Sequence, residues 1–221
     1  MTHQLNGRMP DCNSPFDQIS NSFESIFWIV LFFFMIFSSS CTKDTNPVVP
    51  PPPAKAETII MDLGDMEIPR WGHIETIDFE GDRFPEFIFE ILPVGDWINR
   101  LDRYCYNVKT TRNTALPVNE RNEVPHVSYG IQIPLVDFKG YEWWPSNEIT
   151  LLQKIVPETG TTWWEGNWMD KTLKYLPFQV LRQDGKYAGW LEISTNTQTE
   201  KAIIHRAGIS NTPNVAIKAG I

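Results

Sequence analysis

The sequence predicts an all-β protein: a single antiparallel β-sandwich domain that follows an N-terminal targeting segment and a proline-rich linker. Short runs rich in β-branched and aromatic residues recur along the chain, and clusters of turn-forming residues separate them. Beyond the N-terminal segment, no stretch keeps the 3.6-residue spacing of apolar positions that marks an amphipathic helix. Residues 57–221 are also numerous enough to bury one core without disulfides.

The first strands of the domain are expected soon after Glu57. Residues 58–63 and 72–79 carry β-branched runs, and the second run alternates between two faces. A turn at residues 80–82 precedes a third apolar run at residues 87–92. These segments are therefore predicted to form a β-hairpin.

The next segment favours a short helix. Asp96 is suited to cap a helix N-terminus, and Trp97 and Leu101 would share one helix face. One or two helical turns are accordingly expected at residues 96–104.

The middle of the chain is less regular. Residues 107–127 are polar and contain Pro117 and Pro125, so they are expected to form loops and strand edges. A strand pattern resumes at residues 129–134, whereas residues 148–156 fit either a strand or a helix.

The C-terminal third carries the clearest pattern. Residues 176–182, 186–193 and 201–207 have the length and composition of strands. Asp184 and Gly185 lie in the first connection, and glycine accepts the positive φ that tight hairpin turns need. Three consecutive antiparallel strands are therefore predicted here.

An uncharged apolar run at residues 26–37 precedes three serines and Cys41. As a helix the run would span about 18 Å, less than the roughly 30 Å of a bilayer's hydrocarbon core. It resembles a bacterial lipoprotein signal, and the resemblance implies removal of residues 1–40 and lipidation of Cys41. The alternative is an uncleaved signal anchor or a buried hydrophobic helix.

Residues 41–56 are predicted to be a semi-rigid tether, because residues 46–53 contain a proline cluster that favours extended backbone. The formal net charge of −8 becomes −6 once residues 1–40 are removed, which makes nucleic acid a poor partner. Cys105 would be the one cysteine left inside the domain, so no internal disulfide can form.

Two parts of the domain resemble known secreted proteins. Residues 77–87 are similar to a "D-x-N-x-D-G-x-x-D-F" opening, and Tyr187-Ala-Gly-Trp190 with residues 213–220 is similar to a "Y-G-W" strand and its ending. Together with Cys41 and the tether, the chain resembles an uncharacterised Bacteroidetes-type surface or outer-membrane lipoprotein. This resemblance implies a β fold and a cell-envelope location, and it implies no activity.

One acidic loop has the spacing of calcium ligands. Its members are Asp78, Glu80, Asp82 and Glu86, which occupy positions one, three, five and nine of such a loop. However, Arg83 stands where the loop needs glycine, and Phe89 stands where it needs a bidentate glutamate. A weak calcium site and an ordinary charged hairpin are the two interpretations.

A group of aromatic residues is the leading candidate for ligand binding. Flat rings in polar surroundings can stack on sugar rings, which makes a glycan the leading ligand. The group comprises Tyr141, Trp143, Trp144, Trp163, Trp164 and Trp168. In the alternative interpretation one tryptophan of each adjacent pair packs in the core and the other faces out, or the rings meet a protein partner.

Catalytic patterns are missing from the sequence. The domain's three histidines are isolated, no G-x-S-x-G, phosphate-binding or dinucleotide motif occurs, and Cys105 is typical of a buried apolar residue. Glu142 and Glu165, which both flank tryptophans, could in principle form a glycosidase pair, but a chain with this many acids readily places two of them in such positions by coincidence. We therefore expect a non-enzymatic, lipid-anchored protein of the bacterial cell envelope, in the outer membrane, that binds glycan; the alternative is a structural or adhesion protein with a protein partner.

Overall fold

A computed structural model describes residues 57–68, 73–111, 113–145 and 148–221. These residues all belong to one compact unit, Pro51–Ile221. They contain strands and turns but no helix, so the all-β prediction is confirmed. The described residues accordingly include no helix long and apolar enough to cross a membrane. The targeting segment, the lipidation site Cys41 and the tether lie outside the described residues.

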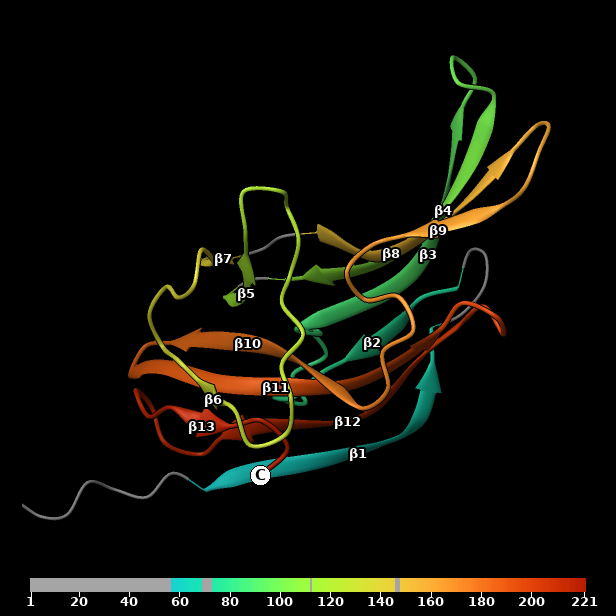
Figure 1. Cartoon of the computed structure of the whole chain (residues 1–221). Coiled ribbons are helices and arrows are strands. Elements are labelled where there is room, and N and C mark those ends of the chain that lie inside the picture. Colours follow the sequence, from blue (N-terminus) through green and yellow to red (C-terminus); the bar gives the residue numbers. More distant parts are fainter. Residues whose placement is uncertain (1–56, 69–72, 112, 146–147) are drawn as a thin grey trace, which may run out of the picture. The chain divides into compact units, whose positions relative to one another are not determined.

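The larger sheet has six strands, and every neighbouring pair in it is antiparallel (Figure 1). In sheet order the strands are β1 (Thr58–Glu67), β12 (Lys201–Ser210), β11 (Gly185–Asn196), β10 (Lys174–Arg182), β5 (Thr114–Val118) and β7 (Glu142–Pro145). Strands β10, β11 and β12 follow one another along the chain and pair in that order. The prediction of three consecutive antiparallel strands is thus confirmed.

The second sheet has five antiparallel strands, and a two-stranded ribbon accompanies the two sheets. The five strands, in sheet order, are β2 (Glu75–Ile77), β3 (Phe87–Asp96), β4 (Leu101–Thr110), β8 (Glu148–Pro157) and β9 (Trp163–Glu165). The ribbon pairs β6 (Gln132–Ile133) with β13 (Ile217–Lys218). Pairing of β2 with β3 confirms the predicted hairpin.

The main core fills the space between the two sheets. Phe87 of β3 lies edge-on to Phe178 of β10, with 4.9 Å between the ring centroids. Phe79 stacks on the same Phe178 ring at 5.3 Å. Phe87 and Phe178 are fully buried and Phe79 is half-buried, and because Phe87 and Phe178 come from different sheets, their contact holds the two layers together as a β-sandwich.

A second apolar cluster covers part of the outer face of the six-stranded sheet. Tyr175 and Trp190 project from β10 and β11 and pack with Ile133, Ile217 and Ala219 from the ribbon and the C-terminal end. The six-stranded sheet is therefore buried on both faces in this region. Burial on both faces explains why β10 is buried almost continuously instead of alternating.

The helical turns predicted at residues 96–104 are wrong. The chain turns back instead: the Asn99 amide donates to Oδ1 of Asp96 at 3.0 Å, and Arg100 has a φ of 53°. Asp96 thus stabilises a turn, a role for which its short side chain is equally suited. Strand β4 then finds hydrogen-bonding partners on both sides, in β3 and β8, and this pairing outweighs a weak local helix preference.

Two other boundaries differ from the sequence prediction. Residues 107–110 continue β4 instead of forming a loop, and the strand expected at residues 129–134 is limited to β6. The ambiguous segment at residues 148–156 is a strand, β8, which lies between β4 and β9 in the sheet. Only pairing with neighbours decides this, because a short apolar run fits either period.

Candidate functional site

The structure separates the aromatic residues that the sequence grouped. Trp143 and Trp144 lie on β7, the edge strand of the six-stranded sheet, while Trp163 and Trp164 lie on β9, the edge strand of the other sheet. Trp168 is fully buried in the main core, so it is not part of any exposed surface.

The two tryptophan pairs are also far apart along β8. Strand β8 begins at Glu148, four residues after Trp144 in the sequence. Trp163 pairs with Ile155, which lies seven residues further along β8. At about 3.3 Å per residue the distance from Glu148 to Ile155 is roughly 23 Å. The two pairs lie on edge strands of different sheets, so neither one strand nor one sheet groups them.

Within each pair, one ring faces solvent and the other packs inward. Trp144 is 57% exposed and Trp163 is 42% exposed, whereas Trp164 packs against the main core and Trp143 against the outer cluster. Adjacent residues of a strand point to opposite faces, which is the alternative that the sequence had left open. Trp144 and Trp163 are thus the rings available to a ligand.

Trp144 borders a groove of about 690 Å³ at the end of the six-stranded sheet. The groove combines aromatic rings with carboxylate, carboxamide and ammonium groups. Its lining comprises Val118, Asn119, Glu120, Asn122, Asp137, Phe138, Lys139, Gly140, Tyr141, Glu142 and Trp144. It therefore keeps two of the predicted aromatic residues, Tyr141 and Trp144, and adds Phe138, which the sequence analysis missed.

One wall of the groove is a tight turn that holds Phe138 and Tyr141. Their backbones exchange two hydrogen bonds of 3.0 and 2.8 Å, and Lys139 and Gly140 between them have φ values of 48° and 81°. Two positive φ values in sequence are typical of a type I′ turn. The turn brings the Phe138 and Tyr141 rings to a centroid distance of 5.8 Å, so both rings are presented on one small rigid element.

The opposite wall is a loop that Asn119 organises. Its Oδ1 accepts hydrogen bonds from the amides of Arg121 and Glu123, each at 2.9 Å, and its Nδ2 donates to Glu123 at 3.0 Å. These hydrogen bonds define the backbone of the loop, and exposed Glu120 and Asn122 line the groove from it.

An apolar cavity of about 750 Å³ lies beyond the Phe138–Tyr141 turn. Phe138, Lys139 and Tyr141 line both the cavity and the groove. The remaining cavity walls include Val127, Ile131 and several prolines from residues 125–134 and β10. The turn thus separates a polar, aromatic groove from a more apolar cavity.

The acidic loop does not gather its carboxylates around one point. Asp78 accepts hydrogen bonds from the amides of Gly81 and Arg83 at 2.7 and 2.8 Å, Glu80 pairs with Arg182 at 2.8 Å, and Glu86 accepts from the Phe79 amide at 2.7 Å. Within the described ranges, no group of three or more His, Cys, Asp or Glu side chains could hold a metal ion.

The pKa values of this loop follow from the same contacts. Partial burial opposes ionisation of Asp78, but hydrogen bonds from backbone amides more than offset it and lower the pKa of this carboxyl. Burial raises the pKa of Glu86, and the charges of Glu80 and Asp78 add to that effect. Asp78 therefore acts as the structural centre of the loop.

The other residues considered for chemistry are engaged elsewhere. Cys105 is buried, its Sγ lies 3.7 Å from Oε1 of Gln153, and burial raises the pKa of its thiol, so it is an unreactive apolar residue. Glu165 accepts hydrogen bonds from Gln153 and from the Trp163 indole, both at 2.9 Å. It lies on the five-stranded sheet and Glu142 on the six-stranded one, at separate edges.

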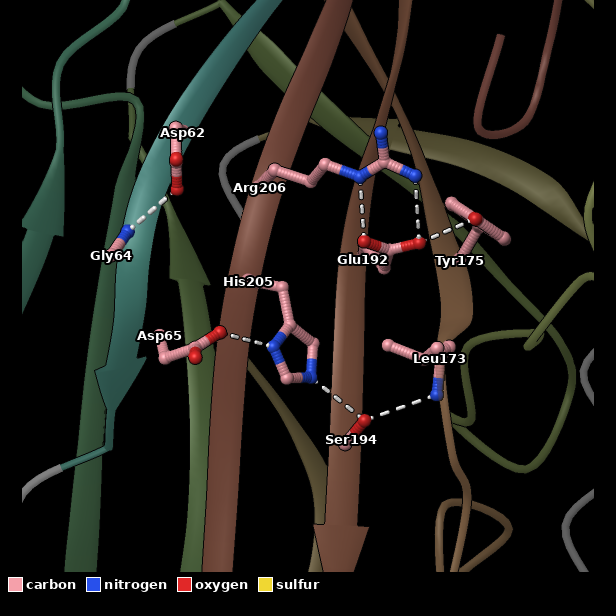
Figure 2. Close-up of polar contacts among 9 residues, drawn as sticks. All are labelled: Asp62, Gly64, Asp65, Leu173, Tyr175, Glu192, Ser194, His205 and Arg206. Carbon is pink, nitrogen blue, oxygen red and sulfur yellow. Dashed lines mark hydrogen bonds and ion pairs between the residues drawn. The ribbon is translucent and has the colours of Figure 1, made fainter.

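A polar network crosses the outer face of the six-stranded sheet (Figure 2). In one part of it, Arg206 donates from Nε and Nη2 to the two oxygens of Glu192 at 2.7 and 3.2 Å, and the Tyr175 hydroxyl donates to Oε1 at 2.5 Å. Burial by itself raises the pKa of Glu192, but the bonds from Arg206 and Tyr175 outweigh burial and lower it. Burial and then Glu192 raise the pKa of Tyr175 to about 12.

The second part of the network joins three strands. Nδ1 of His205 lies 2.6 Å from Oδ1 of Asp65, and Nε2 of the same ring lies 2.8 Å from Oγ of Ser194. Oγ of Ser194 also accepts a hydrogen bond of 3.0 Å from the Leu173 amide. No local sequence pattern predicts this arrangement, because its members are 140 and 11 residues apart.

The fold and the groove define an antiparallel β-sandwich with an aromatic, polar groove at one sheet edge. Comparison with protein-family models, with curated proteins and with solved structures finds no match to this chain.

Proposed function

We propose that this protein is a glycan-binding module of the bacterial cell envelope, and that the groove beside Trp144 is its binding site. The observation that supports this proposal is the combination of Trp144, Tyr141 and Phe138 with exposed Glu120 and Glu142 in one groove.

The chemistry of a sugar suits this lining. One face of a pyranose ring carries C–H groups that stack on an aromatic ring, and Trp144 offers a ring that is 57% exposed. The hydroxyl groups at the edge of the sugar need donors and acceptors, which Asn122, Glu142 and Lys139 can supply. Because a rigid turn and a rigid loop form the walls, binding requires little ordering of the protein.

The test is isothermal titration of the protein with a panel of neutral and acidic oligosaccharides. For the sugars that bind, we expect Trp144→Ala to weaken affinity about tenfold, which corresponds to about 1.4 kcal/mol, because it removes the stacking surface. Tyr141→Ala should weaken binding in the same direction.

Trp163→Ala is the matched control, since Trp163 is also an exposed tryptophan on an edge strand but lies on the other sheet. It should leave the affinity unchanged. A panel without a binder would contradict the proposal, and so would a loss of affinity in Trp163→Ala equal to that in Trp144→Ala.

A protein-binding or adhesion function is the second candidate, and one observation favours it. The turn between β3 and β4 exposes Trp97 and Ile98 at 84% and 91%, the two highest values among the large apolar residues described. Figure 1 shows the ends of β3 and β4 extending from the sheet. Aromatic residues at such a tip are common anchors in protein interfaces.

A further inference from the structure

The polar network on the outer face contains a hydrogen-bonded chain with the connectivity of a nucleophile, a base and an orienting acid. Ser194 of β11 contacts Nε2 of His205 on β12, and Nδ1 of that imidazole contacts Asp65 of β1 (Figure 2). A carboxylate at Nδ1 favours the tautomer with hydrogen on that nitrogen. Nε2 is then free to accept the hydrogen of the Ser194 hydroxyl, as in acyl-transfer enzymes.

Backbone irregularities place the three side chains. The pairing of β11 with β12 shifts register between Glu192 and Ile193, so His205 is an extra residue and both His205 and Arg206 lie on the outer face. The pairing of β1 with β12 also shifts, between Asp62 and Met66. Bulges bend a strand and re-aim its side chains, and they are over-represented next to active sites.

Two non-glycine residues at this place have left-handed backbones. Asp65 has a φ of 57°, and Leu173, whose amide donates to Ser194, has a φ of 46°. Such conformations cost about 1 kcal/mol or more each and persist only where the surrounding structure requires them. The surrounding strands therefore impose the backbone conformations that bring Asp65 to His205 and the Leu173 amide to Ser194.

The three residues are not sealed in the core of the sandwich. Ser194 and His205 are half-buried and Asp65 is exposed, so the three residues reach the surface of the sheet. The apolar ribbon of β6 and β13 packs on Tyr175 and Trp190, and it does not bury Ser194.

We propose that Ser194 is a nucleophile toward activated esters, with His205 as its general base and Asp65 as the residue that orients the imidazole. This activity is independent of glycan binding at the groove and goes beyond it. In the first step Oγ of Ser194 bonds to the acyl carbon and its proton moves to Nε2 of His205. The bond from the acyl carbon to the leaving oxygen breaks, the leaving alcohol takes that proton, and an acyl-serine results.

Water completes the cycle. His205 removes a proton from a water molecule that attacks the acyl-serine, and the proton returns to Oγ as the carboxylic acid leaves. The Leu173 amide donates to Oγ of Ser194 and so orients the hydroxyl. Because that amide is engaged by Oγ and not by the oxyanion, we expect slow turnover, since each oxyanion donor contributes about 10²–10³-fold in rate.

The test is covalent labelling of the full chain with a fluorophosphonate probe, followed by mass spectrometry of the labelled peptides. We expect an adduct on Ser194 that Ser194→Ala abolishes. His205→Ala should slow labelling about 100-fold, the contribution of a general base, and added imidazole should restore part of the rate. A purely structural role of His205 would not give that rescue.

Ser128→Ala is the control, because Ser128 is an exposed serine near the same face whose Oγ accepts from Lys174 at 3.1 Å. It should label like the unsubstituted protein, and thermal melts of each variant show whether it folds. Absence of an adduct on Ser194 overturns the proposal, as does a labelling rate that His205→Ala leaves unchanged. Either result leaves glycan binding at the Trp144 groove unaffected.

Discussion

At the scale of single residues, the most consequential group is the buried carboxylate of Glu192. It lies among apolar rings on the outer face, and it remains charged because Arg206 and Tyr175 satisfy both of its oxygens. The Arg206 guanidinium lies 5.6 Å above the Trp190 ring, which adds a cation–π contact. One buried acid thus connects three strands, β10, β11 and β12.

The lowered pKa of Glu192 makes part of the stability depend on pH. Its folded-state pKa lies below the unfolded value near 4.5, so its contribution is complete above that value and is lost as the pH falls through the folded pKa. We expect Glu192→Gln to lower the free energy of unfolding by about 1–3 kcal/mol at pH 7. The difference from the unsubstituted protein should shrink toward pH 3 in urea unfolding experiments.

Glu67→Gln is the control for this prediction. Glu67 also pairs with a cation, Lys201 at 2.6 Å, but both side chains are more than 40% exposed. Exposed pairs contribute about 0–1 kcal/mol, so this variant should differ little from the unsubstituted protein at either pH. A Glu192→Gln penalty that is the same at pH 7 and pH 3 would contradict the assignment of a charged Glu192.

At the scale of elements, two glycines allow aromatic rings to cross the strands. A Cβ on Gly208 of β12 would lie 2.4 Å from the ring of Trp190, and a Cβ on Gly189 of β11 would lie 2.2 Å from the ring of Phe178. Each glycine thus leaves room for one aromatic ring: Gly208 for Trp190 on the outer face of the larger sheet, and Gly189 for Phe178 in the main core. The close approach of the Trp190 ring explains why position 208 requires glycine.

Gly208→Ala should therefore destabilise the protein by about 1–3 kcal/mol, because Trp190 must move within a packed cluster. Differential scanning calorimetry would show this as a lower melting temperature. Gly95→Ala provides the comparison, since its nearest neighbour to an added Cβ is a side-chain oxygen of Asp102 at an ordinary 3.6 Å. Equal melting temperatures for the two variants would show that the Trp190 ring does not depend on Gly208.

At the scale of the whole molecule, the described domain and the N-terminal segment carry separate information. The domain contains the groove and the polar network, whereas the apolar run before Cys41 indicates where in the cell the protein is expected to be located. We propose a lipid-anchored location for the domain on the strength of that run and of the proline cluster that follows it.

Replacement of the thiol tests this location. We expect Cys41→Ser, expressed in a bacterial host, to lose palmitate labelling, because serine offers no thiol for the lipid, and to move out of the membrane fraction. Cys12→Ser is the matched control and should remain labelled, since Cys12 precedes the apolar run. Retention of label in Cys41→Ser would identify the anchor as something other than this cysteine.

The all-β class and the three C-terminal strands could be predicted from the sequence, because alternation, strand length and turn glycines are local properties. The prediction failed at residues 96–104, where the local preference of Asp96 fits a helix cap and a turn equally well. There, pairing of β4 with β3 and β8 decided the outcome.

The candidate sites depended still more on tertiary structure. The sequence pointed to Tyr141 and Trp144, but only the sheet order separates them from Trp163 and buries Trp168. The contact of Asp65 with His205 could not be predicted, because two strand bulges and the pairing of distant strands create it. Composition and periodicity determined the kind of layers this chain forms, whereas the side chains that meet were decided by register, which no local pattern specifies.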